Sequence, residues 1–171
     1  MYTTQHTIRE PVTLSGIGVH TGHRATLTCL PTLPDHGIKF QRMDMPGQPM
    51  VDAVAEHVVD VSRGTTLGVQ AAVRIGTVEH VLAAMRGLEI DNVLIQLDGP
   101  EVPIMDGSAG PFVKALQQAG LLDQGVTRRF FQVQEALVHR DAAQEVELAA
   151  FPLDAYRLAV MIGYDTPVQI G

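Results

Sequence analysis

Hydrophobic and polar residues alternate in short runs over the first sixty residues. The clearest alternation spans 25–30, where Ala25, Leu27 and Cys29 fall on the same side. A period of two is the pattern of a β-strand that buries one face. The runs therefore predict an antiparallel sheet in which Cys29 is a packed core thiol. Shorter alternations of this kind occur at Val12 and Leu14, and at Ile38 and Phe40.

Two later segments carry apolar residues at the three- and four-residue spacing of an amphipathic helix. We expect the first helix to follow an N-cap at Thr77, and the second to follow an N-cap at Ser108 and end at Gly120. Residues 92–97 resemble a strand, and 65–75 suggest a hairpin before the first helix. The apolar positions of the two helices are Val78, Val81, Leu82, Met85 and Leu88, then Phe112, Val113, Leu116 and Ala119.

These elements predict an α+β fold, a two-layer sandwich of an antiparallel sheet and helices, over residues 1–126. After a short polar connection at 125–129, three strand-like runs follow with no helix to cover them, and such a small sheet is marginal alone. We therefore expect 127–171 to be the beginning of a second, similar domain that is truncated. The alternative is a small β extension packed on the first domain. The strand-like runs are 130–138, 145–151 and 156–162, and 166–170 begins like another strand.

Composition narrows the possible functions. The net charge of −7 and the isoelectric point near 5.4 argue against a nucleic-acid binder, which has a basic surface. No segment approaches the roughly 20 apolar residues of a membrane-spanning helix, and the N-terminus lacks the pattern of a secretory signal. A single cysteine permits no disulfide within the chain. We expect a soluble, cytoplasmic protein.

The candidate for chemistry is the pair Glu79–His80 at the predicted start of the first helix. Both residues fall off the apolar stripe of that helix, so both side chains can face a cleft. An imidazole that holds a metal ion beside a carboxylate that takes a proton from water is the arrangement of metal-assisted hydrolysis. The pair alone is weak support, because adjacent Glu and His residues on a helix are usually just solvated.

Five ordered motifs give the pair a context, and together they resemble the UDP-3-O-acyl-N-acetylglucosamine deacetylase family, zinc-dependent hydrolases of lipid A synthesis. The resemblance covers the whole chain and implies two domains of similar fold with the active site between them. The motifs are Pro11 to Gly22 (PVTLSGIGVHTG), Arg63 to Gly68 (RGTTLG), Thr77 to His80 (TVEH), Ile90 to Asn92 (IDN) and Glu101 to Ser108 (EVPIMDGS).

The resemblance implies a role for each matching residue. His80 matches the first zinc ligand, and Glu79 matches the general base toward the zinc-bound water. The substrate implied is the UDP-sugar lipid precursor, whose N-acetyl group is hydrolysed. His20 and the segment Arg63, Gly64 and Thr65 are expected to bind the substrate beside the metal.

The family draws two further zinc ligands from a His-Lys-x-x-Asp segment of its second domain, and no such segment occurs here. The resemblance therefore implies that a missing second domain, in cis or in trans, completes the site, and that residues 1–171 alone are inactive. One alternative is a non-catalytic, truncated paralogue that binds a ligand or a protein. Another is a stand-alone metalloprotein that uses His20 and His80.

Overall fold

The computed structural model describes residues 3–163, which divide between Arg128 and Arg129 into two compact units. We call residues 3–128 the sandwich unit and residues 129–163 the hairpin unit, and each is described by itself. No helix among the described residues is long and apolar enough to cross a membrane.

The sandwich unit is built on a five-stranded sheet in the order β2-β3-β9-β4-β5. Neighbouring strands are antiparallel except for β4 and β9, which run parallel. The strands are β2 (Val12–Ile17), β3 (Arg24–Pro31), β4 (Ile38–Arg42), β5 (Met50–Asp52) and β9 (Val93–Leu97).

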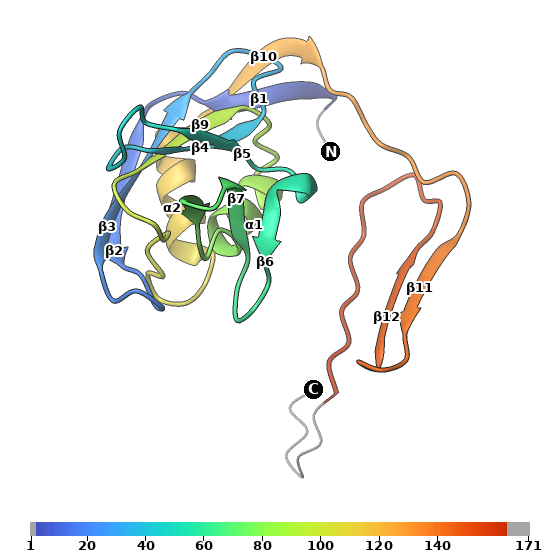
Figure 1. Cartoon of the computed structure of the whole chain (residues 1–171). Coiled ribbons are helices and arrows are strands. Elements are labelled where there is room, and N and C mark those ends of the chain that lie inside the picture. The colour runs from blue at the N-terminus through green and yellow to red at the C-terminus, as the bar shows by residue number, and fades with distance from the viewer. Residues whose placement is uncertain (1–2, 164–171) are drawn as a thin grey trace. The chain divides into compact units, whose positions relative to one another are not determined.

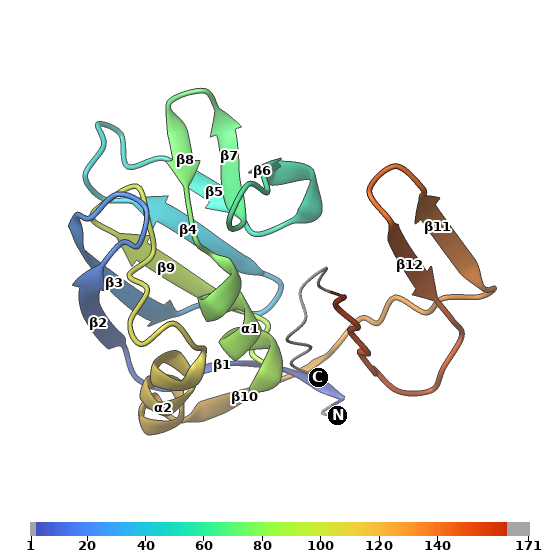
Figure 2. The ribbon, with the colours of Figure 1, turned by 90° about the horizontal axis from the view of Figure 1, so that it is seen from below.

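Two helices, α1 (Glu79–Gly87) and α2 (Gly110–Ala119), cover one face of this sheet (Figures 1 and 2). The core lies between the layers, where Leu27 and Phe40 of the sheet and Met85 and Phe112 of the helices are buried. The predicted α+β sandwich is therefore confirmed. The core location of Cys29 is confirmed too, and burial raises the pKa of its thiol to about 12.

Two smaller sheets complete the sandwich unit. The predicted hairpin at 65–75 is present as β7 (Thr66–Gln70) and β8 (Val73–Ile75). The other edge of β7 pairs with β6 (Val58–Asp60), which follows the short 3-10 helix η1 (Ala55–His57). The other sheet pairs β1 (Thr4–Ile8) with β10 (Leu121–Thr127) in antiparallel fashion. The prediction of a polar connection at 125–129 is therefore wrong for residues 125–127, because they belong to β10.

Both predicted N-caps are displaced. The N-cap of α1 is Val78, while Thr77 has a φ of 59° and uses its hydroxyl for another contact. The N-cap of α2 is Ala109, and the Ser108 hydroxyl instead accepts a hydrogen bond from the Gly110 N–H at 3.1 Å. The predicted end of α2 is confirmed, because Gly120 is its C-cap.

The hairpin unit contains two antiparallel strands, β11 (Leu137–Asp141) and β12 (Val146–Ala150). The run at 145–151 is confirmed by β12, but 130–136 and 156–162 contain no strand. The strand expected at 166–170 lies outside the described residues. That residues from 127 onward begin a second domain stays a prediction.

Candidate functional site

The first turn of α1 presents Glu79 and His80 on the surface of the sandwich unit. The buried residues Val81, Ala84 and Met85 hold the helix against the core. The side chains of Glu79 and His80 stay 38 % and 26 % exposed, and Glu79 Oε1 lies 4.0 Å from His80 Nε2. A carboxylate and an imidazole thus stand side by side, accessible from solvent.

The segment that precedes β7 fixes the Glu79 carboxylate. The Thr65 N–H donates to Glu79 Oε2 at 2.9 Å, and the Val78 N–H donates to the Thr65 carbonyl oxygen at 3.2 Å. The chain before β7 and the start of α1 therefore hold each other in place. Glu79 Oε1 is left to face His80.

Gly64 leaves the space in which Glu79 and His20 approach one another. Its φ is +158°, and a Cβ at this position would lie 3.1 Å from Glu79 Oε1 and 3.7 Å from His20 Nε2. A larger residue would have to displace the carboxylate that it faces. Gly64 therefore lies between two candidate site residues that are 59 positions apart in the sequence.

His20 reaches this place from the turn between β2 and β3. Its Nε2 lies 3.1 Å from the Arg63 carbonyl oxygen. A carbonyl oxygen only accepts, so Nε2 carries the proton in this hydrogen bond and Nδ1 is the free acceptor of a neutral ring. Arg63 takes part through its backbone, which it holds at a φ of 62°.

The structure thus brings together all six residues that the sequence singled out. His20 contacts Arg63, Gly64 lies between His20 and Glu79, Thr65 binds Glu79, and His80 lies beside Glu79. The set is therefore His20, Arg63, Gly64, Thr65, Glu79 and His80. The roles of these residues in binding and catalysis stay predictions.

Sequence reasoning missed one residue next to this site, Glu101. Only 2 % of Glu101 is exposed, and its carboxylate accepts hydrogen bonds from the turn that holds His20 and from Thr77 ahead of α1. Burial raises the pKa of Glu101, but hydrogen bonds from His20, Thr21 and Thr77 outweigh burial, so the pKa is lowered overall. A lone acid in a loop gives no sequence signal of such a role, although Glu101 opens one of the matching motifs.

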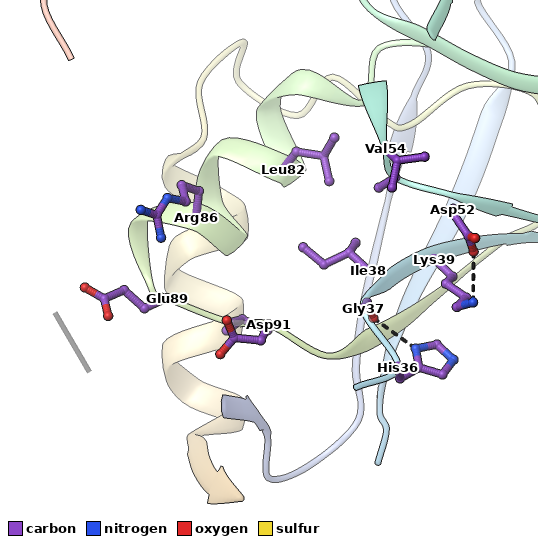
Figure 3. Close-up of a pocket in the computed structure, with 12 residues that line it drawn as sticks. His36, Gly37, Ile38, Lys39, Asp52, Val54, Leu82, Arg86, Glu89 and Asp91 are labelled. Carbon is purple, nitrogen blue, oxygen red and sulfur yellow. Dashed lines mark hydrogen bonds and ion pairs between the residues drawn. The ribbon is translucent and has the colours of Figure 1, made fainter. Parts of the chain in front are cut away.

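A groove farther along α1 is separate from these residues. Leu82 and Arg86 of α1 line it opposite Ile38 and Val54, and an ion pair of 2.9 Å between Lys39 and Asp52 closes one side (Figure 3). None of the six candidate site residues contributes to its lining. The groove is therefore no part of the candidate active site.

The donor chemistry of the site suits zinc, for which imidazole is a common ligand. His80 offers such an imidazole at the surface, with a carboxylate beside it. Within residues 3–163, no three side chains of His, Cys, Asp or Glu are grouped so that they could hold a metal ion together. These residues therefore fit one ligand position of a zinc site rather than a complete site.

The sequence of the chain matches a known protein family. The family model for UDP-3-O-acyl N-acetylglycosamine deacetylase matches residues 5–171. The fold and the match place the chain in a class of deacetylases. Specifically, the chain belongs to the UDP-3-O-acyl N-acetylglycosamine deacetylase family.

Individual relatives show the same kinship. The chain is 43 % identical over 167 residues to the UDP-3-O-acyl-N-acetylglucosamine deacetylase of Myxococcus xanthus. This match covers 98 % of this chain and 52 % of that protein. It is 42 % identical over 163 residues to the bifunctional enzyme LpxC/FabZ of Chlorobaculum tepidum, covering 95 % of this chain and 35 % of that protein. The chain therefore spans about half, or less, of the length of these curated relatives.

Proposed function

We propose that this chain is the N-terminal part of a cytoplasmic UDP-3-O-acyl-N-acetylglucosamine deacetylase of lipid A biosynthesis, with His80 as a zinc ligand and Glu79 as the general base. The observation that carries the proposal is the meeting of Glu79, His80 and His20 around Gly64 in a chain of this family. When bound, zinc would lower the pKa of a water molecule and polarise the amide carbonyl of the substrate.

The contacts of Glu79 suit a general base. Its Oε2 is occupied by the Thr65 N–H, which fixes the direction of the carboxylate, and Oε1 faces His80. In the hydrolysis, water adds its oxygen to the acetyl carbon and gives a proton to Glu79. As the C–N bond then breaks, the leaving nitrogen takes up one proton, which returns Glu79 to its ionised form, and the products are acetic acid, which ionises to acetate, and a free amine on the sugar.

The surrounding residues suit substrate binding. His20 is exposed, and its ring is oriented by the Arg63 carbonyl, so Nδ1 can accept a hydrogen bond from a sugar nucleotide. Gly64 leaves room for the substrate amide close to Glu79. The hydrogen bond at His20 Nε2 leaves Nδ1 as the ring nitrogen that could bind a metal ion, so the alternative of a stand-alone metal site of His20 and His80 would have to use Nδ1.

A catalytic zinc has three protein ligands and one open position. We infer that a second domain, in cis or in trans, contributes the two ligands that complete the site, and that residues 1–171 alone do not turn over substrate. The greater length of the curated relatives supports this inference. The absence of a three-donor group among the described residues supports it as well.

The test compares His80→Ala and Glu79→Gln in the full-length enzyme, with zinc content and acetate release as separate readouts. His80→Ala is expected to lose both. Glu79→Gln is expected to keep its zinc and to lose about 10²- to 10⁴-fold in kcat, the usual contribution of a general base. His23→Ala, an exposed histidine of the same turn as His20, is the matched control and should change neither readout.

Two outcomes would contradict the proposal. One is full turnover by Glu79→Gln, and the other is an unchanged zinc content in His80→Ala. If the wild-type protein binds substrate but releases no acetate, the alternative of a non-catalytic, ligand-binding paralogue is correct instead.

A further inference from the structure

Glu101 is a buried carboxylate on which four hydrogen-bond donors converge. Oε1 accepts from the His20 N–H at 3.0 Å and from the Thr77 hydroxyl at 2.9 Å. Oε2 accepts from the Thr21 N–H at 2.8 Å and from the Thr21 hydroxyl at 2.7 Å. Both oxygens are thus used as double acceptors, an arrangement that suits an ionised carboxylate, which only accepts.

The loop that carries Glu101 runs between the two segments that it binds. Gly76 pairs with Glu101 in a parallel bridge, since the Gly76 N–H donates to the Pro100 carbonyl at 2.9 Å and the Val102 N–H donates to the Gly76 carbonyl at 3.1 Å. On the other side, the turn after β2 wraps around the carboxylate so closely that a Cβ on Gly18 would collide with it. Glu101 therefore joins the His20 turn to the chain that enters α1.

The negative charge of Glu101 is stabilised by hydrogen bonds from neutral donors. Among residues 3–163, no Lys or Arg side chain forms an ion pair with it. A cation would be the simpler partner if the carboxylate only had to be accommodated in the core. Four hydrogen-bond donors from two segments instead fix the position of the Glu101 carboxylate, and the carboxylate in turn fixes the position of the two segments.

Thr77 shows why the start of α1 needs such a contact. A φ of 59° is an outlier for a β-branched residue, and it persists only where neighbouring contacts enforce it. The hydroxyl of Thr77, which is bound to Glu101, supplies that contact two residues before Glu79. The direction in which α1 presents Glu79 and His80 thus depends on this bond.

We propose that Glu101 is a positioning residue, whose carboxylate sets the distance between His20 and Glu79 across Gly64 by holding the His20 turn and Thr77 at once. Its effect on catalysis rests on the proposed deacetylase function. Its effect on geometry does not, so the two can be tested separately.

The geometric test uses Glu101→Gln in residues 1–171. The amide replaces one acceptor oxygen by an N–H₂ group, which must face a backbone N–H of either His20 or Thr21, and a backbone N–H cannot turn around to accept. We expect faster hydrogen exchange, by about tenfold or more, at one of these two amides, and a changed NMR resonance of the His20 ring. Asp98→Asn is the control, because it neutralises an exposed carboxylate of the same loop. Within the described residues, the Asp98 carboxylate accepts a hydrogen bond from the Thr26 N–H and none from the His20 turn.

The catalytic test uses the full-length enzyme. Glu101→Gln should lose about 10- to 100-fold in kcat with an unchanged zinc content, the loss expected when catalytic groups shift by up to about 1 Å. Thr77→Val, which removes only the hydroxyl, should show part of this loss, and Thr77→Ser, which keeps the hydroxyl, should restore it. If Glu101 merely supported the fold, Thr77→Val and Thr77→Ser would not differ in kcat while both kept their zinc.

The outcomes keep the two proposals apart. Wild-type exchange at the amides of His20 and Thr21 in Glu101→Gln would overturn the positioning role, as would equal kcat values for Thr77→Val and Thr77→Ser. A wild-type enzyme without turnover would overturn the deacetylase function alone, and the exchange data would still decide the role of Glu101. If Glu101→Gln does not fold, the positioning role is decided by hydrogen exchange at the His20 amide in Thr77→Val and Thr77→Ser. Different exchange rates in these two variants support the role, and equal rates overturn it.

Discussion

The sandwich unit and the hairpin unit use similar apolar residues with opposite results. In the sandwich unit, helices cover the sheet, and side chains such as Leu27 and Leu116 are at most 1 % exposed. In the hairpin unit, β11 and β12 have no second layer among the described residues, and Leu148 is 70 % exposed. Apolar sequence alone does not form a core, because a sheet needs a second layer to cover its apolar face.

Charged residues repeat the same contrast. Arg128 is buried at the end of the sandwich unit, where its guanidinium binds Asp91 at 2.7 Å and Glu89 at 2.8 Å. These carboxylates raise the pKa of Arg128, with the hydrogen bonds to Asp91 as the largest cause. Arg140 in the hairpin unit has an equally short pair with Glu147 at 2.6 Å, but its side chain is 73 % exposed. Burial, rather than distance, separates the two pairs in energy.

Hydrogen exchange should show the largest difference between the units. Amides of β3 and β9 should be protected on the order of 10⁴-fold or more, because they open only when the whole unit unfolds. Amides of β11 and β12 should exchange within about tenfold of the unfolded rate, since an isolated two-stranded hairpin is marginal in water. Similar protection in both sheets, measured by NMR on residues 1–171, would break the comparison.

Truncating one leucine in each unit sharpens the comparison. Leu116→Ala should lower the free energy of unfolding by about 2–5 kcal/mol, because it leaves a cavity between α2 and the sheet. Leu148→Ala should change it by less than about 0.5 kcal/mol, since the side chain is already largely in water. Urea unfolding followed by circular dichroism measures both, and equal losses would show that the hairpin unit has a core of its own.

The two arginines provide the electrostatic counterpart. Arg128→Ala should destabilise the sandwich unit by about 3 kcal/mol, near the lower end for breaking a buried pair, because the partner carboxylates are about a quarter exposed. Arg140→Ala should have no measurable effect on unfolding by urea. A loss for Arg140→Ala as large as that for Arg128→Ala would contradict the dominance of burial.

The smallest effect is the pH dependence contributed by Glu101. Folding lowers its pKa below the ordinary 4.5, so its carboxylate stabilises the fold above about pH 4.5, and this contribution is lost as the pH falls through the folded pKa. Glu101→Gln should therefore be less stable than wild type by about 1–3 kcal/mol at pH 7, and by clearly less at pH 3. A gap that stays constant between the two pH values would refute the sign of the shift.

The elements that sequence predicted well are those whose burial follows a simple period. Strand β3 alternates cleanly, and α1 has its apolar residues at helical spacing. The sequence did not predict the pairing of β1 with β10, because three of the four buried residues of β1 are polar, namely Gln5, His6 and Thr7, and only Ile8 is apolar. Their hydrogen bonds reach partners such as Asp35, 30 positions away, and Asn92, 85 positions away, which no local pattern reveals.

The site shows the same limit. Glu79 and His80 are adjacent in sequence, so their pairing on α1 was predictable, and the motifs of the family named the other four residues. The role of Glu101 depends on the convergence of His20, Thr21 and Thr77, which approach it only after folding. The backbone conformation at Thr77 was unpredictable for the same reason, since it is enforced by a residue 24 positions away.

The most direct test of the proposed function is acetate release from UDP-3-O-acyl-N-acetylglucosamine by residues 1–171 in the presence of zinc. The sandwich unit is proposed to contribute Glu79 and His80 but not a complete set of zinc ligands. We therefore predict no acetate above background from this chain alone, and turnover when a second domain with a His-Lys-x-x-Asp segment is joined to it. Turnover by residues 1–171 alone would contradict the account.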